Sequence, residues 1–334
     1  MELPKSITFE LTHKCNCRCE MCRFWVEGST IALQEMDHDQ VIKIIENIKK
    51  YYDENGKRLF FGLTGGEPFL KNNFLKIIEH LHRNSIGYDM VTNFSVPNEQ
   101  ILDQFAVYPP ERINISLDGI GETHNLVRGR NIFDDIVRNI KYFKRISPQT
   151  PIKINSTINK RNIESLTEIT KFAIDNGLEL NFQHLNFISP ELLDEQRRLE
   201  IEELNGATVH EATFYTLNEE EVVKLQKEVN RVKKMAKNKN FGVTFLPDLD
   251  KNLATWYLKP EQIIAENRCD INRLRIKPDG RVVHCENFVY GNLVNDDFAD
   301  VINSSDAKRF RTMIEKGNMP FCRRCCLRFK GYKE

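Results

Sequence analysis

Nine cysteines in a chain of 334 residues divide into two groups, one near each end. Cysteine thiolates are the protein ligands of iron–sulfur clusters and of many structural zinc sites. An odd number of cysteines, with no apolar N-terminal segment, argues against a disulfide framework. The two groups therefore predict two metal sites. The first consists of Cys15, Cys17, Cys19 and Cys22, and the second of Cys269, Cys285, Cys322, Cys325 and Cys326.

The first group contains the spacing C-x3-C-x2-C, formed by Cys15, Cys19 and Cys22. Three closely spaced thiolates can bind three irons of a [4Fe–4S] cluster, which leaves the fourth iron open to the amino and carboxylate groups of an amino acid. Cys17 falls outside this spacing and is interpreted as a non-ligand. The cysteines alone leave a structural zinc site as the alternative.

Further motifs accompany the first cysteine group. The segment FELTHKCNCRCEMC, the motif Gly65-Gly66-Glu67-Pro68 and the segment Ile115–Gly119 together resemble the radical S-adenosylmethionine (radical SAM) superfamily. The resemblance implies reductive cleavage of S-adenosylmethionine (SAM) at the cluster to methionine and a 5′-deoxyadenosyl radical, which abstracts a substrate hydrogen atom. It also favours iron over zinc at this group.

The same resemblance implies which residues contact SAM. Gly65, Gly66 and Glu67 would bind its methionyl amino group. Ser116 lies in the segment that contacts the ribose and carboxylate of SAM, and Arg128 is the expected carboxylate partner.

Three further residues are candidates for SAM contacts. Asn93 is a candidate for the ribose. Met21 stands where the family usually has an aromatic residue before the third cysteine, and its thioether can pack against adenine. His184 is a candidate for contact with adenine or substrate, and packing in the scaffold is the alternative.

The second cysteine group supplies four thiolates, from Cys269-x15-Cys285 and Cys322-x2-Cys325. This arrangement resembles the Twitch version of the SPASM extension, which implies one auxiliary [4Fe–4S] cluster with four cysteine ligands. A zinc ribbon has a similar pattern and is the alternative. Cys326 is left over, as a hydrogen-atom donor to a substrate radical or as a spare ligand. No other residue is assigned as catalytic.

The elements that must position these residues alternate between strands and helices, which predicts a parallel sheet. The expected fold is α/β, a partial (β/α)6 TIM-type barrel followed by a small cluster-binding domain. Ligands bind at the carboxyl ends of parallel strands, where the motif residues fall. The predicted strands are Ser6–Thr12, Arg58–Thr64, Tyr88–Thr92, Arg112–Leu117, Lys153–Ile158 and Glu179–Leu185.

The domain organisation follows from the same pattern. Residues 1–190 are expected to form the barrel, residues 191–262 a linker with a long helix, and residues 263–334 the Twitch/SPASM-like domain. The 48 basic and 48 acidic residues balance, so the charge favours neither nucleic acid nor an anionic membrane as a partner. The opening residues contain no apolar run long enough for a signal peptide, so the chain is expected to be cytoplasmic. The expected partners are a small-molecule substrate, with a peptide as the alternative, and an electron donor such as flavodoxin or ferredoxin.

Three functions are consistent with the sequence. The leading hypothesis is oxidation or epimerisation of a small hydroxylated substrate (a sugar, aminocyclitol or nucleoside), with the auxiliary cluster as electron acceptor. The second is a radical SAM peptide maturase that cross-links or epimerises a ribosomal peptide. The third is a non-catalytic metal-binding or redox-sensing protein, which would have no use for the SAM motifs.

Overall fold

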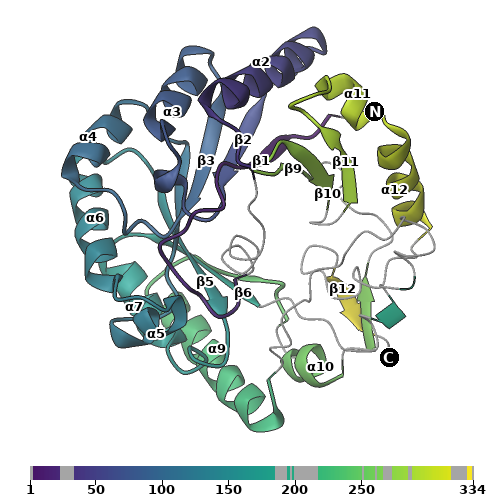
Figure 1. Cartoon of the computed structure of the whole chain (residues 1–334). Coiled ribbons are helices and arrows are strands. Elements are labelled where there is room, and N and C mark those ends of the chain that lie inside the picture. The colour runs from purple at the N-terminus through teal and green to yellow at the C-terminus, as the bar shows by residue number, and fades with distance from the viewer. Residues whose placement is uncertain are drawn as a thin grey trace. The chain divides into compact units, whose positions relative to one another are not determined.

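The structure is a computed structural model of the whole chain. It describes residues 3–22, 34–184, 194–195, 198, 217–249, 252–259, 262–265, 273–284, 288–316 and 329–332. The chain forms two compact units, each assembled from separate segments. Figure 1 labels the helices and strands. The first unit comprises residues 1–115, 132–152 and 270–311, and the second comprises residues 116–131, 153–269 and 312–334.

The first unit is a sheet with helices in its connections. Its strand order is β11-β10-β9-β1-β2-β3-β4, in which β9, β1, β2, β3 and β4 are parallel and β10 and β11 are antiparallel additions. The strands are β1 (Ser6–Glu10), β2 (Phe60–Thr64), β3 (Gly87–Thr92), β4 (Arg112–Ser116), β9 (Arg273–Ile276), β10 (Arg281–His284) and β11 (Phe288–Asn292). The helices are α2 (His38–Glu54), η1 (Pro68–Leu70), α3 (Phe74–Arg83), α4 (Glu99–Val107), α6 (Phe133–Ile146), α11 (Phe298–Ile302) and α12 (Ser305–Glu315).

The second unit contains three parallel strands in the order β5-β6-β7 and an antiparallel pair, β8 with β12. Its strands are β5 (Ile152–Ile158), β6 (Glu179–His184), β7 (Val243–Leu246), β8 (Ile263–Ala265) and β12 (Phe329–Tyr332). Its helices are α5 (Glu122–Arg128), α7 (Leu166–Asp175), α9 (Glu219–Asn238) and α10 (Leu253–Leu258).

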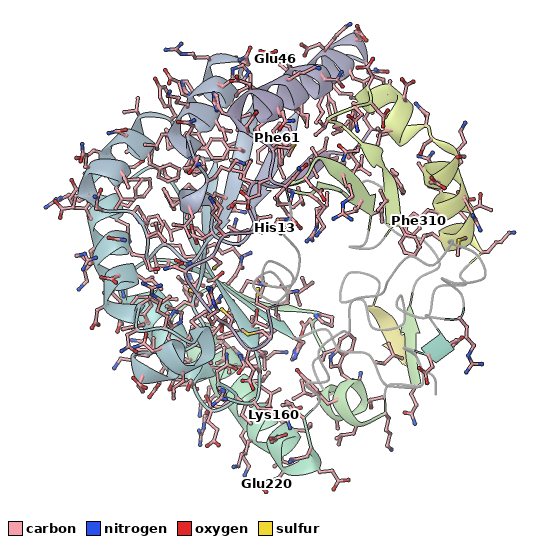
Figure 2. The ribbon with its side chains drawn as sticks, in the orientation of Figure 1. His13, Glu46, Phe61, Lys160, Glu220 and Phe310 are labelled. Carbon is pink, nitrogen blue, oxygen red and sulfur yellow. The ribbon has the colours of Figure 1, made fainter. Side chains whose placement is uncertain are left out.

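Alternation along the parallel strands gives the sheet an apolar face and a polar face. On β1, Ile7 and Phe9 are buried, whereas Thr8 between them is partly exposed. On β2, Phe61 (labelled in Figure 2) is fully buried, and its ring packs against Phe9 with 5.7 Å between centroids. Thr64 on β2 is also partly exposed. The core therefore lies on the apolar face, and polar side chains are left for the other.

Helix α2 shows how the local sequence sets an element. Asp37 accepts a hydrogen bond from Gln40 N (2.8 Å), and the Gln40 side chain accepts one from Asp37 N (3.0 Å). This capping box satisfies two amides at the start of the helix. The apolar residues that follow at helical spacing are buried: Val41, Ile44, Ile45, Ile48 and Tyr52.

The α/β prediction with parallel strands is confirmed, and each of the six predicted strands is present with its ends within about two residues. One difference lies at the end of the first strand, because Thr12, predicted as its last residue, lies beyond the end of β1. The structure also adds β7, parallel to β6, and places β9 directly beside β1.

Candidate functional site

The first cysteine group lies on the loop that follows β1. Cys17 and Cys19 are buried, Cys15 and Cys22 are partly exposed, and none of the four forms a disulfide. The Arg18 guanidinium donates to the carbonyl oxygens of Cys15 and Cys17 at 2.8 and 2.7 Å. The loop therefore carries four reduced sulfur atoms in a fixed turn.

The thiol of Cys17 hydrogen-bonds with the sulfurs of Cys15 and Cys19. These bonds raise the pKa of Cys17 far above its ordinary value and lower the pKa of Cys15. Among the residues that the structure describes, no three Cys, His, Asp or Glu side chains are placed to hold a metal ion. The donors nevertheless fit an iron–sulfur cluster, because reduced thiols in the C-x3-C-x2-C spacing lie on one loop.

The Gly65–Glu67 motif, which follows β2, forms backbone hydrogen bonds with the residues that lead from β1 into the cysteine loop. Gly66 N donates to Thr12 O (2.7 Å), and Glu67 N donates to Lys14 O (2.8 Å). A Cβ on Gly65 would lie 2.6 Å from Thr12 O. Only glycine lets the two segments approach this closely. The glycines of the motif are thus required for this close backbone approach, a structural role that the sequence did not reveal.

The Glu67 side chain is fully buried and joins β2 to the end of β3. Its carboxylate accepts from Thr92 Oγ1 (2.6 Å) and from Asn93 N (2.8 Å). The Asn93 amide in turn donates to Asn16 Oδ1 (2.7 Å) and to Cys17 Sγ (3.5 Å). Asn93, the candidate ribose contact, therefore supports the cysteine loop in this structure.

Sequence reasoning missed Glu35, which holds the loop from another side. Its carboxylate accepts from Thr12 Oγ1 (2.8 Å) and from His13 N (2.7 Å), and Lys71 Nζ lies 4.0 Å away. Burial lowers the pKa of His13, with Glu35 opposing the shift. Glu35 has no neighbouring motif that would have singled it out.

A second missed feature joins β1 to β9. Glu10, fully buried at the end of β1, pairs with Arg275 Nη1 (2.7 Å) and Lys277 Nζ (3.0 Å). The Arg275 side chain is 30% exposed, whereas that of Lys277 is 6% exposed. A charged residue in the apolar run Ile7–Leu11 was the available sequence signal, because a buried charge requires a partner.

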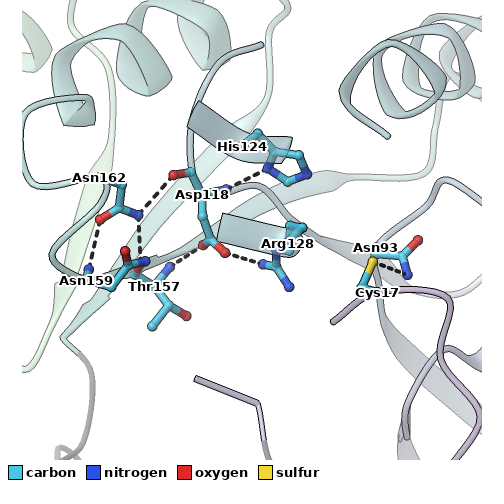
Figure 3. A network of polar contacts seen from close by, with 8 residues as sticks. All are labelled: Cys17, Asn93, Asp118, His124, Arg128, Thr157, Asn159 and Asn162. Atoms are coloured by element: carbon cyan, nitrogen blue, oxygen red, sulfur yellow. Dashed lines mark hydrogen bonds and ion pairs between the residues drawn. The ribbon is translucent and has the colours of Figure 1, made fainter. Parts of the chain in front are cut away.

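The polar residues of the second unit form a separate network around the end of β4 (Figure 3). Asp118 is fully buried, and its Oδ2 lies 2.6 Å from Arg128 Nη2. Asp118 Oδ1 accepts from Thr157 N (2.7 Å). His124 Nδ1 accepts from Asp118 N (3.1 Å), and Asn162 donates to Asp118 O (3.0 Å). Arg128, the predicted carboxylate partner of SAM, is thus held by a buried aspartate.

Burial sets the protonation of this network. It raises the pKa of Asp118, and the charge of Arg128 opposes that shift. Burial also lowers the pKa of His124 to about 3, with Arg128 adding to the effect. His124 is therefore neutral near pH 7, which leaves Nδ1 able to accept its hydrogen bond.

The remaining candidates are placed as follows. Ser116 ends β4 and is partly exposed, and Met21 lies partly exposed in the turn after Cys19. His184 is buried at the end of β6, where its Nδ1 lies 2.9 Å from the Tyr257 hydroxyl. The second cysteine group lies outside the described residues. It consists of the predicted auxiliary ligands Cys269, Cys285, Cys322 and Cys325 and the additional Cys326.

Two family models match this chain. The radical SAM superfamily matches residues 9–173, and the SPASM iron–sulfur cluster-binding domain matches residues 269–326. The chain belongs to the radical SAM superfamily. It is a radical SAM enzyme whose cofactors are SAM and a [4Fe–4S] cluster, and its SPASM domain is a type that binds auxiliary iron–sulfur clusters.

Curated relatives span most of the chain. The tungsten-containing aldehyde ferredoxin oxidoreductase cofactor-modifying protein of Pyrococcus furiosus is 22% identical over 354 residues, covering 97% of this chain and 88% of that protein. A probable GTP 3′,8-cyclase of Saccharolobus islandicus is 27% identical over 288 residues, covering 84% of this chain and 82% of that protein.

Solved structures share the fold. Native anSMEcpe with bound AdoMet has a TM-score of 0.67 at 18% identity, covering 96% of this chain and 89% of that one. Streptococcus suis SuiB has a TM-score of 0.64 at 13% identity, covering 97% of this chain and 72% of that one. The partial TIM-type barrel of radical SAM enzymes is therefore confirmed as the fold class. No helix among the described residues is long and apolar enough to cross a membrane.

Proposed function

We propose that the enzyme uses a SAM-derived radical to oxidise or epimerise a small polar, hydroxylated substrate. Cys15, Cys19 and Cys22 would hold the cluster, which would supply the electron for cleavage of SAM to methionine and a 5′-deoxyadenosyl radical. The observation that carries this proposal is the backbone bonding of the Gly65–Glu67 motif to the cysteine loop. It fixes the loop relative to the motif expected to bind the methionyl amino group.

The residues have distinct roles in this proposal. Cys15, Cys19 and Cys22 hold the cluster, while Cys17 stays a non-ligand. The amino group of SAM is a hydrogen-bond donor, so the Gly65–Glu67 motif serves it through carbonyl oxygens. The amides of Gly66 and Glu67 are already directed to the cysteine loop. Arg128 binds the carboxylate of SAM.

The polar face of the sheet supports a polar substrate. Glu10, Arg275 and Lys277 place two cations and one anion together on neighbouring strands. Part of the Arg275 side chain reaches solvent. One relative is named for the cyclisation of GTP, which is a small polar molecule, and another is named for the modification of a cofactor. Both observations favour a small polar molecule over an apolar one.

Oxidation of an alcohol to a carbonyl removes one hydrogen atom, one proton and one electron from the substrate. The carbon-bound hydrogen leaves as an atom to the 5′-deoxyadenosyl radical, the hydroxyl proton passes to water, and one further electron must be accepted. We propose that the auxiliary site of Cys269, Cys285, Cys322 and Cys325 accepts it. Epimerisation instead needs a hydrogen-atom donor, for which Cys326 is the candidate.

The test is anaerobic incubation of the reconstituted protein with SAM and a strong reductant, with 5′-deoxyadenosine quantified. We expect the wild type to form the nucleoside and the Cys15/Cys19/Cys22→Ala triple variant to form none, while the matched control Cys17→Ala keeps activity. No nucleoside from cluster-loaded wild type, with any member of a substrate panel present, would refute the proposal.

The substrate panel separates the rival substrate classes with the same readout. It contains sugars, aminocyclitols, nucleosides and short peptides encoded near the gene. Stimulation of 5′-deoxyadenosine formation by a peptide alone would replace the small-molecule proposal by the peptide-maturase alternative. Incorporation of solvent deuterium at the reacting carbon distinguishes epimerisation from oxidation.

A further inference from the structure

Asp118 occupies an unusual position for an acidic residue. It follows β4, its side chain is fully buried, and both carboxylate oxygens have partners, Thr157 N and the Arg128 guanidinium. A buried carboxylate is costly in free energy unless it is paired and hydrogen-bonded. A charged carboxylate buried at this position therefore suggests a role beyond packing.

The backbone of Asp118 is held as firmly as its side chain. Its N–H donates to His124, and its carbonyl accepts from Asn162, which also donates to Thr157 O at 2.8 Å. A Cβ on the next residue, Gly119, would lie 2.8 Å from His124 N, so the chain turns tightly into α5 here. The carboxylate of Asp118 is therefore a fixed point.

Arg128 is attached to this fixed point by its guanidinium. It ends α5, its side chain is 13% exposed, and Figure 3 shows the guanidinium directed at Asp118. A guanidinium presents its N–H donors in a rigid fork, so holding one nitrogen sets the direction of the others. The ion pair with Asp118 thus sets the orientation of the Arg128 guanidinium.

We infer that Asp118 is a positioning residue that orients Arg128 toward the carboxylate of SAM. This inference rests on the proposed function of Arg128 and adds a residue to it. Without Asp118 the arginine side chain regains its rotamer freedom, which binding must then remove. A competing effect exists, since removing a negative neighbour also makes Arg128 more attractive to an anion. The inference requires that orientation outweighs this gain.

The test uses two ligands and cluster-loaded protein under anaerobic conditions. Dissociation constants are measured calorimetrically for SAM and for its decarboxylated analogue, with Asp118→Asn compared with wild type. The matched control is Asp135→Asn, which removes an exposed Asp–Arg pair with Arg138 at 2.7 Å. Iron content and thermal unfolding show that each variant is folded and loaded.

We expect wild type to prefer SAM over the decarboxylated analogue, and Asp118→Asn to lose affinity for SAM by about tenfold or more, as for one charge-assisted hydrogen bond. Its affinity for the analogue should stay within about twofold of wild type, because that ligand lacks the group which Arg128 binds. Asp135→Asn should match wild type with both ligands.

Other outcomes overturn the inference. Equal loss for both ligands would assign Asp118 a general structural role, and tighter SAM binding by Asp118→Asn would show that Asp118 competes with the cofactor. If Asp118→Asn does not fold, Asp118→Glu, which keeps the charge but displaces it, must show the same selective loss. A wild type that binds no SAM would refute the proposed function as well, whereas unchanged selectivity in the variant would refute this inference alone.

Discussion

Gly66→Ala tests the physical basis of the candidate site most directly. A Cβ on Gly66 would overlap Lys14 O and lie 2.7 Å from His13 O. Both are backbone atoms of the cysteine loop, so they cannot move aside as a flexible side chain would. The loop must shift, and the bonds Gly66 N to Thr12 O and Glu67 N to Lys14 O are broken or lengthened.

The loss of stability expected for Gly66→Ala can be estimated from these contacts. Two backbone hydrogen bonds contribute about 1 kcal/mol each, and overpacking costs about 1–3 kcal/mol, so we expect a destabilisation of about 3–5 kcal/mol. This is a large part of the roughly 5–15 kcal/mol that stabilises a typical domain. The displaced cysteines should also bind less iron.

The assays are anaerobic urea unfolding and iron content after reconstitution. The matched control is Gly62→Ala on β2, where a Cβ meets only Thr8 Oγ1 at 4.0 Å. We expect this control to equal wild type or to gain slightly, because glycine is unfavourable within a strand. If Gly66→Ala unfolds within about 1 kcal/mol of wild type and binds as much iron, the reasoning is refuted.

Three further outcomes are expected. Cys17→Ser should retain the iron content of wild type while Cys19→Ser loses it, and loss in both would make Cys17 a ligand. Glu35→Gln should lower the unfolding free energy by about 1–3 kcal/mol, because a neutral amide accepts weakly from Thr12 Oγ1 and His13 N; equal urea midpoints would contradict this. Burial depresses the pKa of His124 from 6.5 to about 3, so the neutral imidazole contributes fully to the free energy of unfolding only above pH 6.5. As the pH falls to 5, the free energy of unfolding should decrease by about 2 kcal/mol, because the unfolded chain binds the proton first. His124→Gln, which keeps an acceptor, should therefore lose less stability between pH 7 and pH 5, and an equal loss would refute the assignment.

The strands of the fold were predictable because each carries a strong local signal. β1 and β2 alternate buried apolar residues with partly exposed ones, and helices such as α2 show a buried stripe after a capping residue. β7 was missed, since four residues after a long interruption do not distinguish a strand from a loop. The pairing of β9 with β1 is a long-range contact, and local patterns do not encode it.

Residues of the candidate site could be proposed from the sequence where their spacing along the chain indicates a ligand. The cysteine spacing predicts a cluster loop, whereas the partners of that loop depend on how β2 and β3 end beside it. Glu35 could not be found, because its contact with Thr12 spans 23 residues and belongs to no motif. Likewise, the sequence singled out Arg128, but its ion pair with Asp118 depends on the turn of the chain into α5.

The ion pairs of Glu10 have a consequence for how the chain is made. Glu10 meets Arg275 and Lys277 across 265 and 267 residues of sequence. β1 lies between β2 and β9, so one neighbour of the first strand emerges from the ribosome only near the end of synthesis. Until then, β1 has an open edge and a carboxylate without its cations. A nascent or truncated chain that stops before β9 should therefore be prone to aggregation, because the SPASM segment completes the sheet that the radical SAM segment begins.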